Sequence, residues 1–173
     1  ARVTSLQNTD PYAKAGLMVR ENLTAGSRHV ILDVKPGGGV EFMMRSASSG
    51  ATTFIAGGSA TFPAWLRLTR SGNTFVGAHS ANGTTWTEIG RVTLTLPAGL
   101  NVGFAVTSHT TTALATAMFD TVTVSGQPAN LPPSVTLTAP SNGQSFAAPG
   151  PIALAATAAD SDGQVAGVEF FSG

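Results

Sequence analysis

The chain has 173 residues, of which 42% are apolar and only 10% are charged. Nine Lys and Arg balance nine Asp and Glu without forming a basic cluster, which argues against nucleic acid or an anionic membrane surface as a partner. The absence of cysteine excludes disulfide scaffolds and thiol catalysis, and no apolar run approaches the roughly 18 residues that a membrane span needs.

Short segments of alternating apolar and polar residues recur between turn signals, and helical periodicity is scarce. This pattern predicts an all-β chain. The strands expected in the first domain are 1–5, 15–21, 29–35, 40–46, 65–70, 74–80, 85–88, 101–108 and 115–124. Period-two alternation places one set of apolar side chains in a single interior between two antiparallel sheets. That set is Leu17, Val19, Leu66, Leu68, Val102, Phe104 and Val106.

A proline-rich stretch divides the chain. Residues 126–133 read G-Q-P-A-N-L-P-P, which predicts an interdomain linker between a first domain at 1–125 and a second at 134–173. Strands are expected in the second domain at 134–139, 152–159 and 165–171. Since an immunoglobulin sandwich has about seven strands in about 100 residues, we expect only the N-terminal part of such a domain.

Several segments carry a family resemblance. They are D-P-Y-A-K-A-G-L-M-V-R-E-N from Asp10, W-L-R-L-T-R-S-G-N-T-F from Trp65 and V-G-F-A-V-T-S-H from Val102. Together they resemble the concanavalin A-like lectin/glucanase superfamily module of the DUF1349 type, across residues 1–125. The segment V-T-L-T-A-P-S-N-G from Val135 is similar to bacterial Ig-like domains.

The resemblance implies a lectin-like jelly-roll β-sandwich in a secreted or cell-surface, multidomain bacterial protein, with carbohydrate binding as its role. Members of the family usually carry further strands ahead of the segment that begins here at Ala1. We therefore expect the first sandwich to lack its first strands.

Catalytic residues are not predicted. Glycoside hydrolysis needs two carboxylates about 5 to 10 Å apart, and the E-x-D-x-E triplet of the superfamily's glucanases is absent. Glu21, Glu41 and Glu88 each stand alone on a separate predicted strand. Hydrolysis would require further acids to face Glu41 or Glu88, so we expect this chain not to be an enzyme.

No metal or cofactor is predicted either. His29, His79 and His109 lack the spacing of metal ligands. Asp160 and Asp162, beside Gly163, are a weak candidate for calcium, because they supply too few of the six to eight oxygens that the ion takes. A plain Asp-Gly turn is the preferred interpretation.

Sugar recognition combines an aromatic platform with groups that make planar hydrogen bonds, a task suited to arginine. Alternation puts Arg20, Arg45 and Arg67 on the polar side of their strands, where they could line one common face. Trp65 is placed equally well in the core or on that face, whereas Trp86 is expected to fill the core under a hairpin. The predicted carbohydrate-binding residues are Arg20, Arg45, Trp65 and Arg67. The alternative interpretation is that the three arginines are only solvent-exposed or form ion pairs with Glu21, Glu41 or Glu88.

The sequence thus predicts a non-catalytic carbohydrate-binding or adhesion module whose partners are a polysaccharide or glycoconjugate and the neighbouring domains of the same chain. Two alternatives stay open: a structural spacer without a ligand, and a fragment of a glycoside hydrolase.

Overall fold

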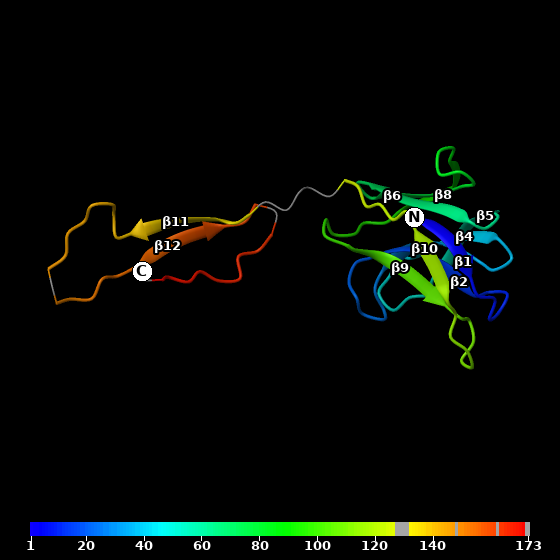
Figure 1. Cartoon of the computed structure of the whole chain (residues 1–173), viewed down its shortest axis with the longest axis horizontal. Helices are drawn as coiled ribbons and strands as arrows, with labels where there is room; N and C mark the ends of the chain where they lie inside the picture. Colours follow the sequence, from blue (N-terminus) through cyan, green and yellow to red (C-terminus); the bar gives the residue numbers. More distant parts are fainter. Residues whose placement is uncertain (127–131, 148, 162, 172–173) are drawn as a thin grey trace. The chain divides into compact units, whose positions relative to one another are not determined.

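The computed structural model describes residues 1–126, 132–147, 149–161 and 163–171. The chain divides into two compact units, Ala1–Thr123 and Val124–Gly173 (Figure 1). The residues expected to form most of the linker, 127–131, lie outside the described residues.

The first unit is an antiparallel β-sandwich of two five-stranded sheets. We call them the β3 sheet and the β6 sheet. The β3 sheet has the order β5 (Thr53–Ser59), β4 (Gly39–Arg45), β3 (His29–Val34), β2 (Lys14–Arg20) and β9 (Asn101–Thr107). The β6 sheet has the order β10 (Ala117–Asp120), β1 (Arg2–Leu6), β6 (Ala64–Ser71), β7 (Thr74–Ser80) and β8 (Thr87–Thr93).

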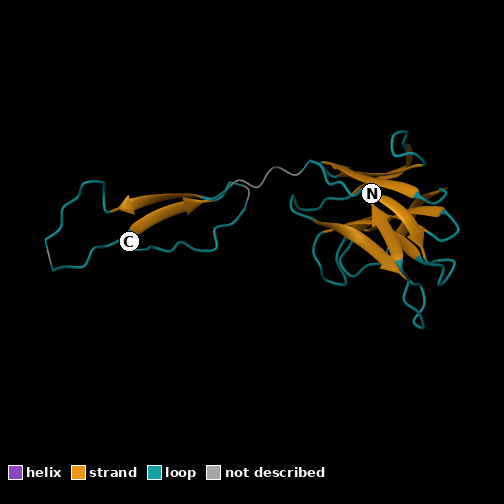
Figure 2. Ribbon diagram, viewed as in Figure 1, coloured by secondary structure: helices purple, strands orange, loops and turns teal. Residues whose placement is uncertain are grey.

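Alternate residues of these strands form one core between the sheets. Val30, Leu32 and Val34 of β3 pack in a cluster with Leu66 of β6 and Phe75 of β7, all of them fully buried. The other residues of the same strands therefore face outward, which positions the polar side chains. In Figure 2 the described chain consists of strands and loops, which confirms the predicted all-β class.

The predicted interior is correct for Leu17, Val19, Leu66 and Leu68, which belong to the core or pack against it. The prediction fails for three residues of β9. They pair with inward-facing residues of β2, but β9 is an edge strand and the opposite sheet covers it incompletely. Phe104 is 47% exposed and stacks on Phe119 with a ring-centroid distance of 4.2 Å. Val102 and Val106 are 57% and 45% exposed.

Two strand predictions need correction. β5 was not expected, because its sequence T-F-I-A-G-G-S has two glycines and no clear alternation, yet it pairs along β4. In the second unit, β11 (Ser134–Ala139) and β12 (Ala155–Ala159) form an antiparallel pair. Residues 165–171, expected as a strand, have no regular secondary structure.

Among the described residues there is no helix of the length and apolarity required to span a membrane.

Candidate functional site

The four predicted binding residues lie on two different faces. Arg20 on β2 and Arg45 on β4 point outward from the β3 sheet, whereas Trp65 and Arg67 lie on β6, in the other sheet. The outer faces of a sandwich point in opposite directions. The expectation that Arg20, Arg45 and Arg67 line one common face is therefore wrong, because alternation along a strand does not reveal which sheet the strand joins.

The outer face of the β3 sheet carries three cross-strand rows of side chains. The strand register aligns Gly16, Asp33 and Glu41 in the first row. A middle row is apolar, and its members are Met18, Ile31, Met43 and Phe54. The third row aligns Asn101, Arg20, His29 and Arg45. From Lys14 to Arg20 the outer face extends about 20 Å along β2, because a strand rises about 3.4 Å per residue.

One end of this face holds a cluster of charges under an aromatic ring. Glu41 forms ion pairs with Lys14, at an N–O distance of 3.2 Å, and with Lys35, at 3.0 Å. The two lysine Nζ atoms also lie 5.7 and 5.4 Å from the ring centroid of Tyr12. Tyr12 itself is 55% exposed. This end of the face therefore presents a partly solvent-accessible aromatic surface beside charged groups.

Asp33 lies in the same cluster but is completely buried, and neither of its carboxylate oxygens has a hydrogen-bond partner among the described residues. Burial, together with the negative charge of Glu41, raises the pKa of Asp33 to about 7. For Glu41, burial also acts to raise the pKa, but the hydrogen bonds from Lys35 and Lys14 outweigh it and the pKa is lowered. Two neighbouring carboxyl groups are thus held at different affinities for a proton.

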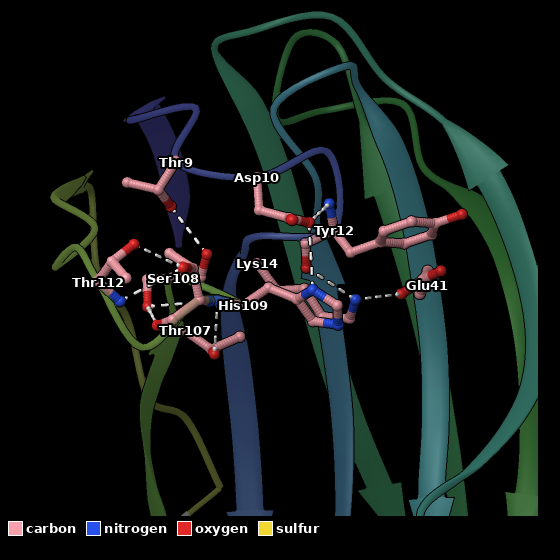
Figure 3. A network of polar contacts seen from close by, with 10 residues as sticks. Thr9, Asp10, Tyr12, Lys14, Glu41, Thr107, Ser108, His109 and Thr112 are labelled. Carbon is pink, nitrogen blue, oxygen red and sulfur yellow. Dashed lines mark hydrogen bonds and ion pairs between the residues drawn. The ribbon is translucent and has the colours of Figure 1, made fainter.

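The position of Tyr12 is fixed by a polar network around the loop that precedes β2 (Figure 3). Asp10 accepts a hydrogen bond from the backbone N–H of Tyr12 at 2.7 Å and lies 3.1 Å from Nδ1 of His109. The ring of His109 is 5.4 Å from that of Tyr12. Lys14 donates to the carbonyl oxygen of Tyr12 at 3.0 Å. These contacts connect the loop after β9 to the charged end of the β3 sheet.

The opposite end of the face is positively charged. Arg20 donates to the carbonyl oxygen of Thr24, and Arg45 donates to that of Ala25 at 2.8 Å. The Nε atoms of both arginines are buried without a hydrogen-bond partner in the described part of the chain. His29 lies between them and is 5% exposed. Burial lowers the pKa of His29, and the positive charges of Arg45 and Arg20 lower it further.

A shallow groove of about 360 Å³ runs beside this positive end, along the edge of the β3 sheet. The outward residues Gly103 and Ala105 of β9 are small, and Asn101, Arg20 and Met18 stand beside them in the register. The groove is lined by Met18, Arg20, Leu23 and residues 101–106. It therefore combines apolar side chains with an arginine and an amide.

On the outer face of the β6 sheet, cations already lie near the aromatic rings. The guanidinium of Arg67 lies 4.2 Å from the ring centroid of Trp86, and that of Arg2 lies 5.4 Å from Trp65. A Cβ atom on Gly83 would lie only 2.9 Å from the indole of Trp65, so the turn packs tightly on that ring. The expectation that Trp86 fills the core is wrong: Trp86 is half-buried, lies outside the core cluster and has the guanidinium of Arg67 over its ring.

Sequence reasoning did not identify Tyr12, Lys14 or Asp33 as members of a site. A signal for Asp33 exists, because it is the single acid within the continuous apolar run V-I-L-D-V, and a fully buried acid in a protein is normally paired. The other two lie on the loop before β2 and at its first residue. Nothing in their local sequence indicates that they meet Glu41, 27 residues further along from Lys14.

The calcium candidate is described only in part. Asp160 accepts a hydrogen bond from the backbone N–H of Gly163 at 3.0 Å, as in an Asp-Gly turn. Asp162 lies outside the described residues. Within the described ranges, no group of three or more His, Asp or Glu side chains is arranged to hold a metal ion.

Comparison with known proteins identifies one part of the chain. No curated protein and no solved structure matches it significantly. A family model described as a bacterial Ig domain matches residues 133–173. The β11–β12 pair lies in this segment, and the predicted Ig-like character of residues 134–173 is thereby confirmed. The chain thus joins a β-sandwich, at its N-terminal side, to a segment that is similar to bacterial Ig domains.

Proposed function

We propose that the first unit is a non-catalytic carbohydrate-binding module that acts through the outer face of the β3 sheet. The groove beside Arg20 carries this proposal, because it places hydrogen-bonding groups next to apolar side chains on an exposed sheet. Binding sites for small polar molecules combine a mainly apolar lining with a few placed polar groups.

The lining suits a sugar chain. Arg20 and Asn101 supply planar donors and an amide carbonyl for paired hydroxyls, and Met18 and Leu23 supply apolar surface for the C–H face of a ring. At the far end of the face, the exposed ring of Tyr12 offers a second apolar contact. The two ends are about 20 Å apart along β2, so the face suits an extended oligosaccharide better than a single sugar.

A binding role is supported over hydrolysis by the state of the two neighbouring carboxyl groups. Asp33 is fully buried, and Glu41 is engaged by Lys14 and Lys35. A general acid or nucleophile must reach the scissile bond, with the two carboxyl groups on either side of it. Side by side on adjacent strands, Asp33 and Glu41 do not offer that arrangement.

The wider context is a secreted or cell-surface bacterial protein. The match of residues 133–173 to a bacterial Ig domain supports it, and the resemblance of residues 1–125 to the concanavalin A-like lectin module implies the same setting. In such a protein, the sandwich would hold a neighbouring enzyme or adhesin near its polysaccharide target.

Affinity gel electrophoresis against a panel of soluble polysaccharides tests the proposal. We expect at least one polymer to retard the full chain, and Arg20→Ala to abolish the retardation. Arg67→Ala is the matched control, because it removes an arginine from the outer face of the other sheet and should leave retardation unchanged. Loss of retardation in Arg67→Ala alone would move the site to the β6 sheet.

A spacer role without a ligand is the second candidate, and the match of residues 133–173 to a bacterial Ig domain is compatible with it. It predicts no retardation by any polysaccharide for the unmodified chain. The same gels therefore separate the two functions.

A further inference from the structure

We propose that the saccharide bound by this face is acidic, and that Arg20 and Arg45 bind its carboxylate or sulfate groups. This inference rests on the proposed carbohydrate-binding function and specifies the chemical class of the ligand.

The zero net charge of the chain conceals a strong separation of charge. All nine Lys and Arg lie within Ala1–Thr123, together with only six of the nine Asp and Glu, so that unit carries a formal charge of +3. The remaining three acids lie in the second unit, which has no Lys or Arg. An excess of one sign on a unit attracts ligands of the opposite sign and raises their local concentration.

Within the first unit, Arg20 and Arg45 differ from most other cations. Arg2, Arg28 and Arg91 each pair with a carboxylate, as do Lys14 and Lys35. Neither Arg20 nor Arg45 forms an ion pair with a described residue. Two partly buried guanidinium groups on one row, without a carboxylate, leave a positive charge that an anion would neutralise.

Both side chains retain hydrogen-bonding capacity. A guanidinium has five N–H donors, and the hydrogen bonds from these residues to backbone carbonyls use Nη2 of Arg20 and Nη1 of Arg45. These contacts orient the two groups against the loop at residues 21–28. The second terminal nitrogen of each can then donate to a carboxylate or sulfate oxygen, so the bonds that hold the loop also preorganise the site.

The spacing suits a chain of charged sugars. Arg20 and Arg45 lie on β2 and β4 with His29 of β3 between them, so their backbones are about 10 Å apart. The groove begins at Arg20 and continues along β9 over Gly103 and Ala105. One anionic group would bind between the arginines, and the adjoining sugars would occupy the groove.

A saccharide fits this lining better than a nucleic acid. Single-stranded nucleic acids are bound by stacking their bases on aromatic side chains along a basic track. The one aromatic residue in the groove lining, Phe104, is already stacked on Phe119. Met18, Leu23, Gly103 and Ala105 instead offer the low, apolar surface on which a sugar ring can rest.

Isothermal titration of the full chain with matched polymers tests the charge requirement. The probes are polygalacturonate against its fully methyl-esterified form, and dextran sulfate against dextran. We expect at least tenfold tighter binding of one charged polymer than of its neutral partner, with affinity that falls as salt is added. The double substitution Arg20→Gln and Arg45→Gln should remove this preference, and Arg91→Gln, in the other sheet, should preserve it.

The outcomes separate the two claims. Equal binding of the charged and neutral polymers would overturn the acidic ligand and leave carbohydrate binding intact, whereas binding of none of the four, together with no retardation by any polysaccharide in the affinity gels, would overturn both. If a single-stranded oligonucleotide bound as tightly as the charged polysaccharides, or more tightly, the conclusion that the ligand is a saccharide would be overturned.

A second measurement avoids the risk that the double variant fails to fold. The proton NMR titration of His29, in the unmodified protein with saturating tri-galacturonate or sulfated trisaccharide, should move to higher pH, because the anion offsets the neighbouring arginine charges. A titration unchanged by either oligosaccharide would contradict the placement of the anion beside Arg20 and Arg45.

Discussion

Asp33 and Glu41 lie directly opposite each other on β3 and β4, yet Glu41 is engaged by two lysines while the oxygens of Asp33 have no hydrogen-bond partner among the described residues. The cost of burying an ionised carboxylate explains why Asp33 retains its proton to a much higher pH than usual. This residue therefore links the stability of the sandwich to pH.

The sign of that link follows from its pKa. Asp33 has a pKa of about 7 in the folded chain against an ordinary value of 3.8. Its contribution to stability is complete below pH 4 and is lost as pH rises towards 7, by about 1.4 kcal/mol for each pKa unit. We therefore expect Asp33→Asn to gain stability relative to the unmodified chain between pH 4 and pH 8, as measured by urea unfolding at several pH values.

Asp120→Asn is the control for that series, because it should show the opposite trend. The hydrogen bond from Arg2 lowers the pKa of Asp120, so the carboxylate stabilises the fold at neutral pH and loses this effect in acid. If the difference in unfolding free energy between Asp33→Asn and the unmodified chain stayed constant across the pH range, the raised pKa of Asp33 would be contradicted.

Gly16 is expected to be irreplaceable in the β3 sheet. A Cβ atom at this position would lie 2.1 Å from the carbonyl oxygen of Leu32 and 2.5 Å from Cα of Asp33, both of which are backbone atoms. Since the backbone of β3 cannot move without disturbing the core, Gly16→Ala should destabilise the unit by about 3 kcal/mol or more. Gly99→Ala, where a Cβ atom would meet nothing within 4 Å, should change thermal stability by less than about 0.5 kcal/mol.

The turn at Gly83 gives a second matched pair. Gly83 and Gly72 have φ of +75° and +59°, so alanine at either position costs about 1 kcal/mol in backbone strain. Only at Gly83 would the new methyl group also meet the indole of Trp65. Gly83→Ala should therefore be the more destabilising and should alter tryptophan fluorescence, whereas equal losses and unchanged spectra would show that the turn does not press on Trp65.

The core is expected to be uneven in its tolerance of truncation. Leu66 is fully buried, so Leu66→Ala should cost about 2 to 5 kcal/mol. Val106 occupies an inward position by register but is 45% exposed at the edge, so Val106→Ala should cost less than about 1 kcal/mol. Denaturant midpoints of the two variants check this, and comparable losses would show that β9 is covered in solution.

The difference in burial between Leu66 and Val106 also shows what could be predicted from the sequence and what could not. Alternation along β2 and β6 correctly predicted that Leu17 and Leu66 face the core, because it reports on side-chain direction within a strand. The same pattern along β9 could not show that the strand lies at an edge, since coverage depends on the opposite sheet. For a similar reason, alternation shows that Arg20 and Arg67 both face outward but not that they lie on different sheets.

The charged cluster around Glu41 depended on register and therefore lay beyond the sequence. Lys14, Asp33 and Glu41 come from three strands, and a shift of one residue in either pairing would turn one of them into the core. Local sequence identifies candidate strands and turns, as it does for the turn at Asn82-Gly83. It carries little information on which residues of neighbouring strands lie opposite each other. Long-range pairing brought the cluster together.

All six residues of β3 are buried, and hydrogen-bonded strands flank it on both sides. Its amide hydrogens can reach solvent only when both neighbouring strands separate from it and the long side chains above it withdraw. Deuterium labelling of β3 should consequently report the opening of the entire sandwich, while labelling of β9 should report only the peeling of one edge.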